Sequence, residues 1–246
     1  MSVFKGSDPL KIPAPAGDPP VWQVDLPGAR AYFSTRLGGE SSGPYESLNL
    51  GILTDDENNL VVRNRARFAE RAGLSSDAVV QGRQVHGTEI KEWGERQPTL
   101  EEVDGHITGR DGLGLLVLVA DCLPVALAGG GQIAMLHCGW RGLAGGIVEE
   151  ALARFDDPPA AALGPCIGRC CYEVGPEVLN AFSAYPEAAA GHMLSLRVVA
   201  EAKLREAGVS QVEHVDVCTS CNPGLLFSHR RDNGVTGRQC GLVVRA

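Results

Sequence analysis

Three short segments place two histidines and one cysteine where they could hold a metal ion. These segments are Gln84-Val85-His86-Gly87, Asp121-Cys122-Leu123-Pro124 and Leu136-His137-Cys138-Gly139. Two imidazoles and one thiolate suit Zn²⁺, and three protein ligands leave the fourth tetrahedral position open for water or substrate. The pattern therefore predicts a catalytic zinc on His86, Cys122 and His137. A buried thiol and hydrogen-bonded histidines would explain the same residues without a metal.

The segments before two of these residues have the composition of buried strands. Apolar runs at 115–119 and 133–136 precede Cys122 and His137. Continuous apolar runs of this length are typical of central strands. We expect residues 113–138 to form the core of the sheet, with adjacent strands bringing Cys122 and His137 to one edge.

The rest of the chain alternates between strand-like and helical patterns. Strands are predicted at 29–35, 212–217 and 239–245, and helices from Asp55 or Asp56 to about Gly73 and at 143–155, 176–185 and 195–207, with a long loop after residue 38. No glycine-rich phosphate fingerprint follows the first strand. We therefore predict an α+β fold with mixed β-sheets packed in layers and flanking helices, rather than a doubly wound sheet.

Composition limits the class of protein. A chain of 246 residues that is 44% hydrophobic can bury one large core, and we expect a single domain at 21–246 behind a flexible, proline-rich arm at 1–20. No signal peptide or membrane span is apparent. Eight cysteines without a secretory signal favour a reducing compartment, so we expect a cytoplasmic protein. A formal charge of −8 disfavours nucleic-acid binding.

A second group of cysteines has spacing compatible with a metal. Cys218 and Cys221 are separated as in a zinc knuckle, and Cys166, Cys170 and Cys171 are available as partners for a closed four-cysteine site. Reduced thiols in packed loops explain these residues equally simply.

Arginines close to the C-terminus form a candidate anion site. Arg230, Arg231 and Arg238 lie within about ten residues, and their guanidinium groups match phosphate or carboxylate. Arg141 adds a further guanidinium beside the start of the predicted helix at 143–155. A solvated terminal loop is the alternative.

Taken in order, the motifs resemble those of the YfiH-like, laccase-domain-containing family over about residues 30–245. The matching motifs include Gln84-Val85-His86-Gly87, Ala120-Asp121-Cys122, His137-Cys138-Gly139-Trp140-Arg141-Gly142, Gly164-Pro165-Cys166-Ile167 and Arg230-Arg231-Asp232. The resemblance implies one catalytic zinc on His86, Cys122 and His137. It also implies phosphorolysis of adenosine, inosine, guanosine and methylthioadenosine with phosphate as co-substrate, and adenosine deamination at the same site. The sequence departs from the usual pattern at Cys138 and His229.

Further residues are expected to assist the metal or to bind the substrates. Asp121 is expected to transfer protons or to support the metal. Arg36, Arg141 and Arg230 are expected to hold phosphate. Gln84 and Asn49 are expected to bind the nucleoside, with loop stabilisation as the alternative for these two and for Asp121.

Three rival functions stay open, and a fourth fails. A metal-free cysteine hydrolase or deamidase would use Cys122 activated by His86 or His137. The resemblance also links bacterial relatives to peptidoglycan editing, which makes a hydrolase of cell-wall precursors the next alternative. A non-catalytic binding module would hold structural zinc and unfold without it. Laccase chemistry fails because its copper sites need many paired histidines and this chain has six.

Overall fold

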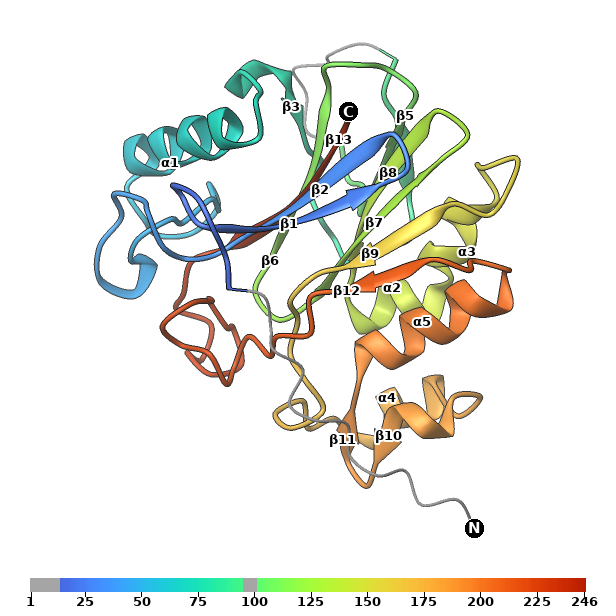
Figure 1. Cartoon of the computed structure of the whole chain (residues 1–246). Helices are drawn as coiled ribbons and strands as arrows, with labels where there is room; N and C mark the ends of the chain where they lie inside the picture. The colour runs from blue at the N-terminus through green and yellow to red at the C-terminus, as the bar shows by residue number, and fades with distance from the viewer. Residues whose placement is uncertain (1–13, 95–100) are drawn as a thin grey trace.

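The computed structural model describes residues 14–94 and 101–246, in which two β-sheets pack against each other (Figure 1). The five-stranded sheet has the order β1 (Val21–Leu26), β2 (Ala29–Ser34), β13 (Gln239–Arg245), β6 (Gly114–Val119) and β3 (Val79–Val80). The six-stranded sheet has the order β12 (Val212–His214), β9 (Ala160–Leu163), β7 (Leu123–Gly129), β8 (Gln132–Cys138), β5 (Gly105–Thr108) and β4 (Ile90–Glu92). Both sheets mix parallel and antiparallel pairs, and a small hairpin joins β10 (Ala189–Ala190) to β11 (Met193–Leu194).

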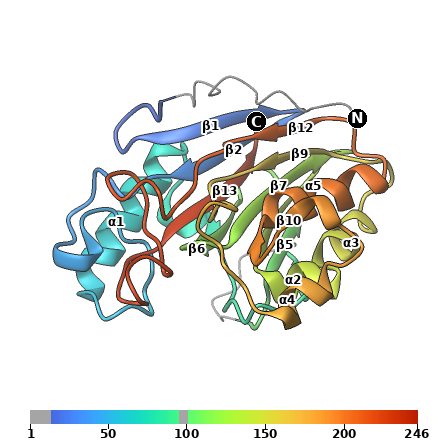
Figure 2. The same cartoon turned by 90° about the horizontal axis from the view of Figure 1, so that it is seen from below.

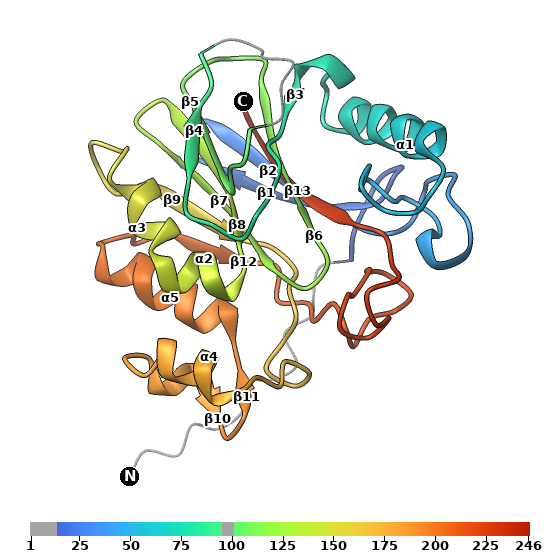
Figure 3. The ribbon, with the colours of Figure 1, turned by 180° about the vertical axis from the view of Figure 1, so that it is seen from behind.

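Helices cover the outer faces of the sheets (Figure 2). They are α1 (Asn58–Arg71), α2 (Trp140–Gly145), α3 (Ile147–Leu152), α4 (Pro176–Ala181) and α5 (Leu196–Glu206), with short 3₁₀ turns at Gly43–Tyr45, Ser76–Ala78 and Pro186–Ala188. The helix α1 lies beside the five-stranded sheet, α2, α3 and α5 lie beside the six-stranded sheet, and α4 lies beyond α5 (Figure 3). The predicted α+β class in layers is confirmed. No helix in the described part of the chain has the length and apolar character needed to cross a membrane.

The central strands are apolar on both faces because each has a packed layer on either side. In β6, Leu115 and Val117 face the six-stranded sheet, whereas Leu116 packs towards Phe68 of α1. In β7, Ala126 faces the five-stranded sheet and its neighbours on either side face the helices. This two-residue alternation is that of a strand buried on both faces.

The prediction that 113–138 forms the core of one sheet is wrong. β6 belongs to the five-stranded sheet, and the hairpin of β7 and β8 belongs to the other. The chain crosses between the sheets through Asp121 and Cys122, and Asp121 has a φ of 95°. A short polar residue tolerates this left-handed region better than a bulky one. The crossing places Cys122 between the ends of both sheets.

Several predicted helix boundaries also change. The helix expected at 143–155 begins at Trp140 and is divided into α2 and α3 by Gly146, whose φ of 97° interrupts the α-helical path. The helix α1 begins at Asn58 after Glu57, which forms no side-chain cap, and the carboxylate of Asp56 instead accepts hydrogen bonds from Asn49 and from the N–H of Glu57. The expected helix at 176–185 ends at Ala181, and the expected strand at 212–217 ends at His214.

Other boundaries agree closely with the sequence. Ser195 accepts a hydrogen bond from the N–H of Val198 and so caps α5, and the last strand is found at 239–245 as predicted. Of the predicted arm at 1–20, residues 1–13 lie outside the described part. Within its remainder, Asp18 forms an ion pair with Arg67 of α1.

Candidate functional site

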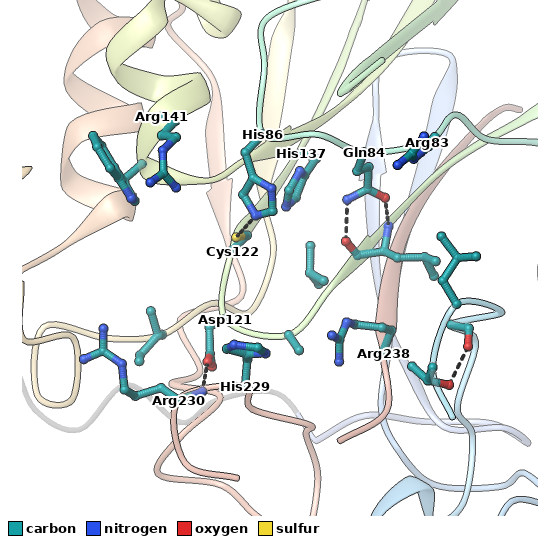
Figure 4. A pocket seen from close by; sticks show the side chains of 18 of the residues that line it. Arg83, Gln84, His86, Asp121, Cys122, His137, Arg141, His229, Arg230 and Arg238 are labelled. Carbon is teal, nitrogen blue, oxygen red and sulfur yellow. Dashed lines mark hydrogen bonds between the residues drawn. The ribbon is translucent and has the colours of Figure 1, made fainter. Parts of the chain in front are cut away.

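The three predicted metal ligands lie together at one end of the sheets (Figure 4). Each offers a ligand atom, and all three atoms lie within 4.8 Å of one another. Cys122 directly precedes β7, and His137 lies in β8 opposite Pro124 of β7. His86 comes from the loop between β3 and β4, and its ring meets that of His137 edge to face with centroids 4.8 Å apart. The expected convergence of Cys122 and His137 is therefore present, but it arises from the pairing of β7 with β8 and not from the run at 115–119, which lies in the other sheet.

A buried carboxylate that the sequence analysis missed orients this cluster. Oδ1 of Asp104 lies 2.7 Å from Nδ1 of His137, so Nε2 of that ring faces the cluster. The carboxylate also accepts the backbone N–H groups of Val85, His86 and Gly87 at 2.8–3.0 Å. Asp104 has no spacing motif. The sole sign in the sequence is a carboxylate directly before the short strand β5.

The electrostatics favour a charged sulfur and a charged imidazole in the metal-free protein. Burial opposes ionisation of Cys122, but His137 and then His86 outweigh it and lower the pKa of Cys122 to about 6. Burial likewise opposes a charge on His137, but Cys122 and Asp104 raise the pKa of His137 to about 9. Burial also opposes the charge of Asp104, and hydrogen bonds from His137 and Gly87 reverse this and lower its pKa.

The donor set fits zinc. Two imidazoles and a thiolate are ligands that Zn²⁺ accepts, and a carboxylate on the far nitrogen of a ligand histidine is its usual support. Gly139 leaves room for the ligands, because a Cβ there would lie 2.9 Å from Cδ2 of His86 and 3.3 Å from Sγ of Cys122. The site therefore has the chemistry of a three-ligand centre with an open position.

A cavity of about 510 Å³ opens beside the cluster. Its size suits a ligand the size of a nucleoside. Apolar and aromatic side chains form much of its wall, among them Leu53, Leu118, Trp140, Ile167 and Tyr172. Its charged lining is mainly cationic, consisting of Arg83, Arg141, Arg230, Arg238 and a single carboxylate, Asp121. The described part of the pocket therefore favours an anion.

The arginines of the pocket differ in what they already bind. Arg141 lies in the first turn of α2 and packs over Trp140, with no hydrogen-bond or ion-pair partner among the described residues. Arg230 packs over Tyr172 and donates to the carbonyl of Glu173. Arg141 is thus the guanidinium most available to a ligand.

The predicted C-terminal arginine cluster is divided by the structure. Arg238 reaches the pocket while donating to the carbonyls of Thr236 and Gly237. Arg231 turns inward and binds Asp232 and the carbonyl of Thr219, so it does not line the pocket. No sequence pattern distinguishes Arg231 from Arg238.

Asp121 points away from the metal ligands, although it precedes Cys122. Its Oδ1 accepts the hydroxyl of Thr219 at 2.5 Å, and its Oδ2 accepts the N–H of Arg230 at 2.7 Å. Figure 4 shows its carboxylate beside His229, which also lines the pocket. Asp121 therefore fixes the loop that carries His229 and Arg230.

Three of the predicted substrate residues serve the scaffold. Gln84 lines the pocket, but its amide pairs with both backbone groups of Leu118 at 2.7 Å. Asn49 is fully buried and binds four neighbours, including the N–H of Arg238. Arg36 donates to the carbonyls of Glu46 and Pro223 and packs over Phe227. Neither Asn49 nor Arg36 lines the pocket, because each is engaged in joining loops.

Comparisons with known proteins agree in both sequence and structure. A family model described as multi-copper polyphenol oxidoreductase laccase matches residues 30–246. Purine nucleoside phosphorylase YlmD of Geobacillus stearothermophilus is 35% identical over 248 residues, which cover 89% of this chain and 90% of that protein. Purine nucleoside phosphorylase YfiH of Shigella flexneri is 35% identical over 237 residues, covering 91% and 96%. The crystal structure of hypothetical protein YfiH from Bacillus licheniformis is similar with a TM-score of 0.85 at 31% identity, covering 89% and 93%.

Proposed function

The chain belongs to the family described as multi-copper polyphenol oxidoreductase laccase, and from this membership and the site we propose that it is a zinc-dependent purine nucleoside phosphorylase. The proposed substrates are adenosine, inosine, guanosine and methylthioadenosine. One observation carries the proposal: four guanidinium groups line a nucleoside-sized pocket beside a three-donor centre. The one carboxylate in the described lining, Asp121, already accepts a hydrogen bond from Thr219. The relatives named as purine nucleoside phosphorylases support it.

The proposed reaction joins phosphate to the sugar. A phosphate oxygen bonds to C1′ while the bond from C1′ to N9 breaks, and the electron pair of that bond leaves with the purine. The base takes up a proton, and the products are free purine and ribose 1-phosphate, or its 5-methylthio form from methylthioadenosine. Zinc, when held by His86, Cys122 and His137, supplies a Lewis acid next to the substrate and lowers the pKa of water.

The side chains of the pocket divide the remaining work. Arg141 binds phosphate through charge-assisted hydrogen bonds and holds it against C1′. The apolar wall near Ile167 and Tyr172 excludes water and receives the purine. His229 donates a proton to N7 of the departing base. Among the described residues that line the pocket, it is the histidine that does not belong to the metal-binding cluster.

We also propose adenosine deamination at this site as the lesser activity. That reaction replaces the 6-amino group with an oxygen from water and releases ammonia. Asp121 is the carboxylate in the described lining, and both its oxygens are engaged by Thr219 and Arg230. Proton transfer at the purine therefore falls to His229 in this reaction as well.

A second candidate is a cysteine hydrolase active without metal. The low pKa of Cys122, the raised pKa of His137 and the bond from His137 to Asp104 form a nucleophile, base and orienting carboxylate. The same sulfur cannot attack a substrate while it binds zinc. Zinc that is bound by the wild type and lost in Cys122→Ala would overturn this candidate.

The test is purine release from adenosine and inosine by zinc-loaded protein, with and without phosphate, beside a Cys122→Ala control. We expect base release and ribose 1-phosphate only when phosphate and Cys122 are both present. Release of base without phosphate would replace the phosphorylase with a nucleoside hydrolase. No turnover by zinc-loaded protein would reject purine nucleosides as substrates, and cell-wall precursors would be assayed next.

A further inference from the structure

Four cysteines form a second cluster away from the three ligands described above. The Sγ atoms of Cys170, Cys171, Cys218 and Cys221 all lie within 4.8 Å of one another. Sγ of Cys221 is 3.5 Å from that of Cys170 and 3.3 Å from that of Cys171. These separations exceed a disulfide bond of about 2.05 Å. They are close to the spacing of about 3.8 Å that four sulfurs have around a tetrahedral zinc with Zn–S of about 2.3 Å.

Two loops from distant parts of the sequence bring the four sulfurs together. A β-bridge pairs Cys166 with Cys218, and the N–H of Thr219 donates to the carbonyl of Cys166 at 3.1 Å. The carbonyl of Gly168 accepts the N–H of Cys171, which turns the chain back at the vicinal cysteines. The cluster thus rests on backbone hydrogen bonds that do not involve its sulfur atoms.

The surroundings of the sulfurs resemble those of metal-bound thiolates. The N–H of Gly168 donates to Sγ of Cys218 at 3.2 Å. Hydrogen bonds from backbone N–H groups to sulfur are the usual outer support of a thiolate ligand. Cys166, the remaining candidate from the sequence, lies apart in the core, where its sulfur contacts Arg197 at 3.6 Å.

We propose that Cys170, Cys171, Cys218 and Cys221 bind a second zinc ion in a closed, structural site. Four sulfur ligands leave no position for substrate, and a tetrahedral set of four sulfurs selects zinc or iron. The spacing of Cys218 and Cys221 is that of a zinc knuckle. A single disulfide would not account for the cluster, because Cys221 contacts two other sulfurs and the fourth also lies within reach.

The second zinc would hold one wall of the pocket. The loop of Cys170 and Cys171 carries Ile167 and Tyr172 into the lining, and the loop of Cys218 carries Thr219, which binds Asp121. A metal shared by both loops fixes these contacts in place. The inference is independent of the reaction proposed above, since it concerns ligands that do not face the substrate.

The test measures the number of metal ions per chain in the full-length protein by inductively coupled plasma mass spectrometry. We expect two zinc ions per chain in the wild type and one in Cys122→Ala, which disrupts only the first centre. The double variant Cys171→Ser with Cys221→Ser is expected to retain one, and all three substitutions together none. Cys166→Ala removes a sulfur beside the cluster without removing a ligand, and it should keep two.

Cobalt substitution covers the case in which the double variant does not fold. Cobalt loaded into Cys122→Ala should give the intense charge-transfer absorption of a four-thiolate site, and a chelator should remove it. Equal zinc in the wild type and the folded double variant would overturn the proposal. So would a disulfide among the four cysteines with one zinc per chain, or iron in place of the second zinc.

Discussion

Nδ1 of His137 lies 2.7 Å from Oδ1 of Asp104, a carboxylate with no exposed surface. The same carboxylate accepts the N–H of His86, so one buried group sets the direction of two ligands from different elements. Because β5 pairs with β8, Asp104 stands directly beside the strand that carries His137. The metal-binding loop is thereby attached to the six-stranded sheet.

Asp104→Asn is expected to weaken zinc binding by about 10- to 100-fold, the usual effect of removing the carboxylate behind a ligand histidine. An amide removes the negative charge beside Nδ1 of His137, and it offers only one oxygen to that ring and to the three backbone N–H groups. Affinity is measured by competition with a chromogenic chelator. Asp121→Asn is the control, since its carboxylate binds Thr219 and Arg230 rather than a ligand. Unchanged zinc affinity in a folded Asp104→Asn variant would show that Asp104 does not support the metal ligands.

Gly139→Ala is expected to displace the ligands and lower zinc occupancy while leaving the backbone unstrained. Gly139 has φ −75° and ψ 168°, which any residue adopts, but its Cβ would meet His86 at 2.9 Å. Gly175→Ala is a matched control, because Gly175 also precedes a helix with φ −78° and ψ 169° and has open space around it. Zinc content and thermal unfolding are measured for both. Equal zinc content in the two variants would show that the close approach is tolerated.

In metal-free protein, alkylation of Cys122 should accelerate as pH rises through about 6, the lowered pKa of this thiol. The rate of alkylation rises with pH because only the thiolate reacts, and the thiolate forms above the pKa of the thiol. His137 stays charged up to about pH 9 and stabilises that thiolate. Iodoacetamide labelling of the peptide that contains Cys122, followed by mass spectrometry, gives the profile. His137→Ala should move the midpoint to higher pH, and zinc should suppress labelling.

The sequence predicts which three donor residues come together because the type of a side chain and the segment that carries it are local properties. His86, Cys122 and His137 each stand at the end of an apolar or glycine-bounded segment, and their donor atoms are of types that fit zinc. Strand β13 and helix α5 were also predicted to within one residue of their observed bounds, since apolar patterning depends on neighbouring residues. The crossing of the chain between the sheets at Asp121 was not predicted, because β6 and β7 are both apolar and nothing in their sequences assigns them to different sheets.

The supporting residues were harder to predict because their roles depend on contacts distant in sequence. Asp104 acts on His137, 33 residues away, and no spacing rule connects them. Asn49 and Arg36 have the polar groups of ligand-binding residues, and only their partners show that they join loops. A polar side chain in a motif is thus compatible with binding a ligand or with satisfying buried backbone groups.

Asn49→Ala is expected to destabilise the fold by about 3 kcal/mol, because stranding a buried donor or acceptor costs about 1–3 kcal/mol each. Its side chain binds Thr54, Asp56 and two backbone N–H groups, so several partners lose their bonds together. Urea unfolding measures the change. Asn59→Ala, at an exposed position of α1, should change stability by less than about 0.5 kcal/mol. A stable Asn49→Ala with a raised KM for nucleoside would instead restore its predicted binding role.

Arg141→Gln is expected to raise the KM for phosphate by about 10- to 150-fold, which corresponds to the loss of one charge-assisted hydrogen bond of about 1.5–3 kcal/mol. Its guanidinium has no polar partner among the described residues, so its removal strands no protein group. Arg83→Gln is the control, because Arg83 lines the same pocket but is exposed and pairs with Glu102 at 3.1 Å. That variant should change the KM by no more than about threefold. Zinc content is measured in both, since only a variant that keeps its metal reports on phosphate. An unchanged KM for phosphate in zinc-loaded Arg141→Gln would transfer the phosphate site to Arg230 or Arg238.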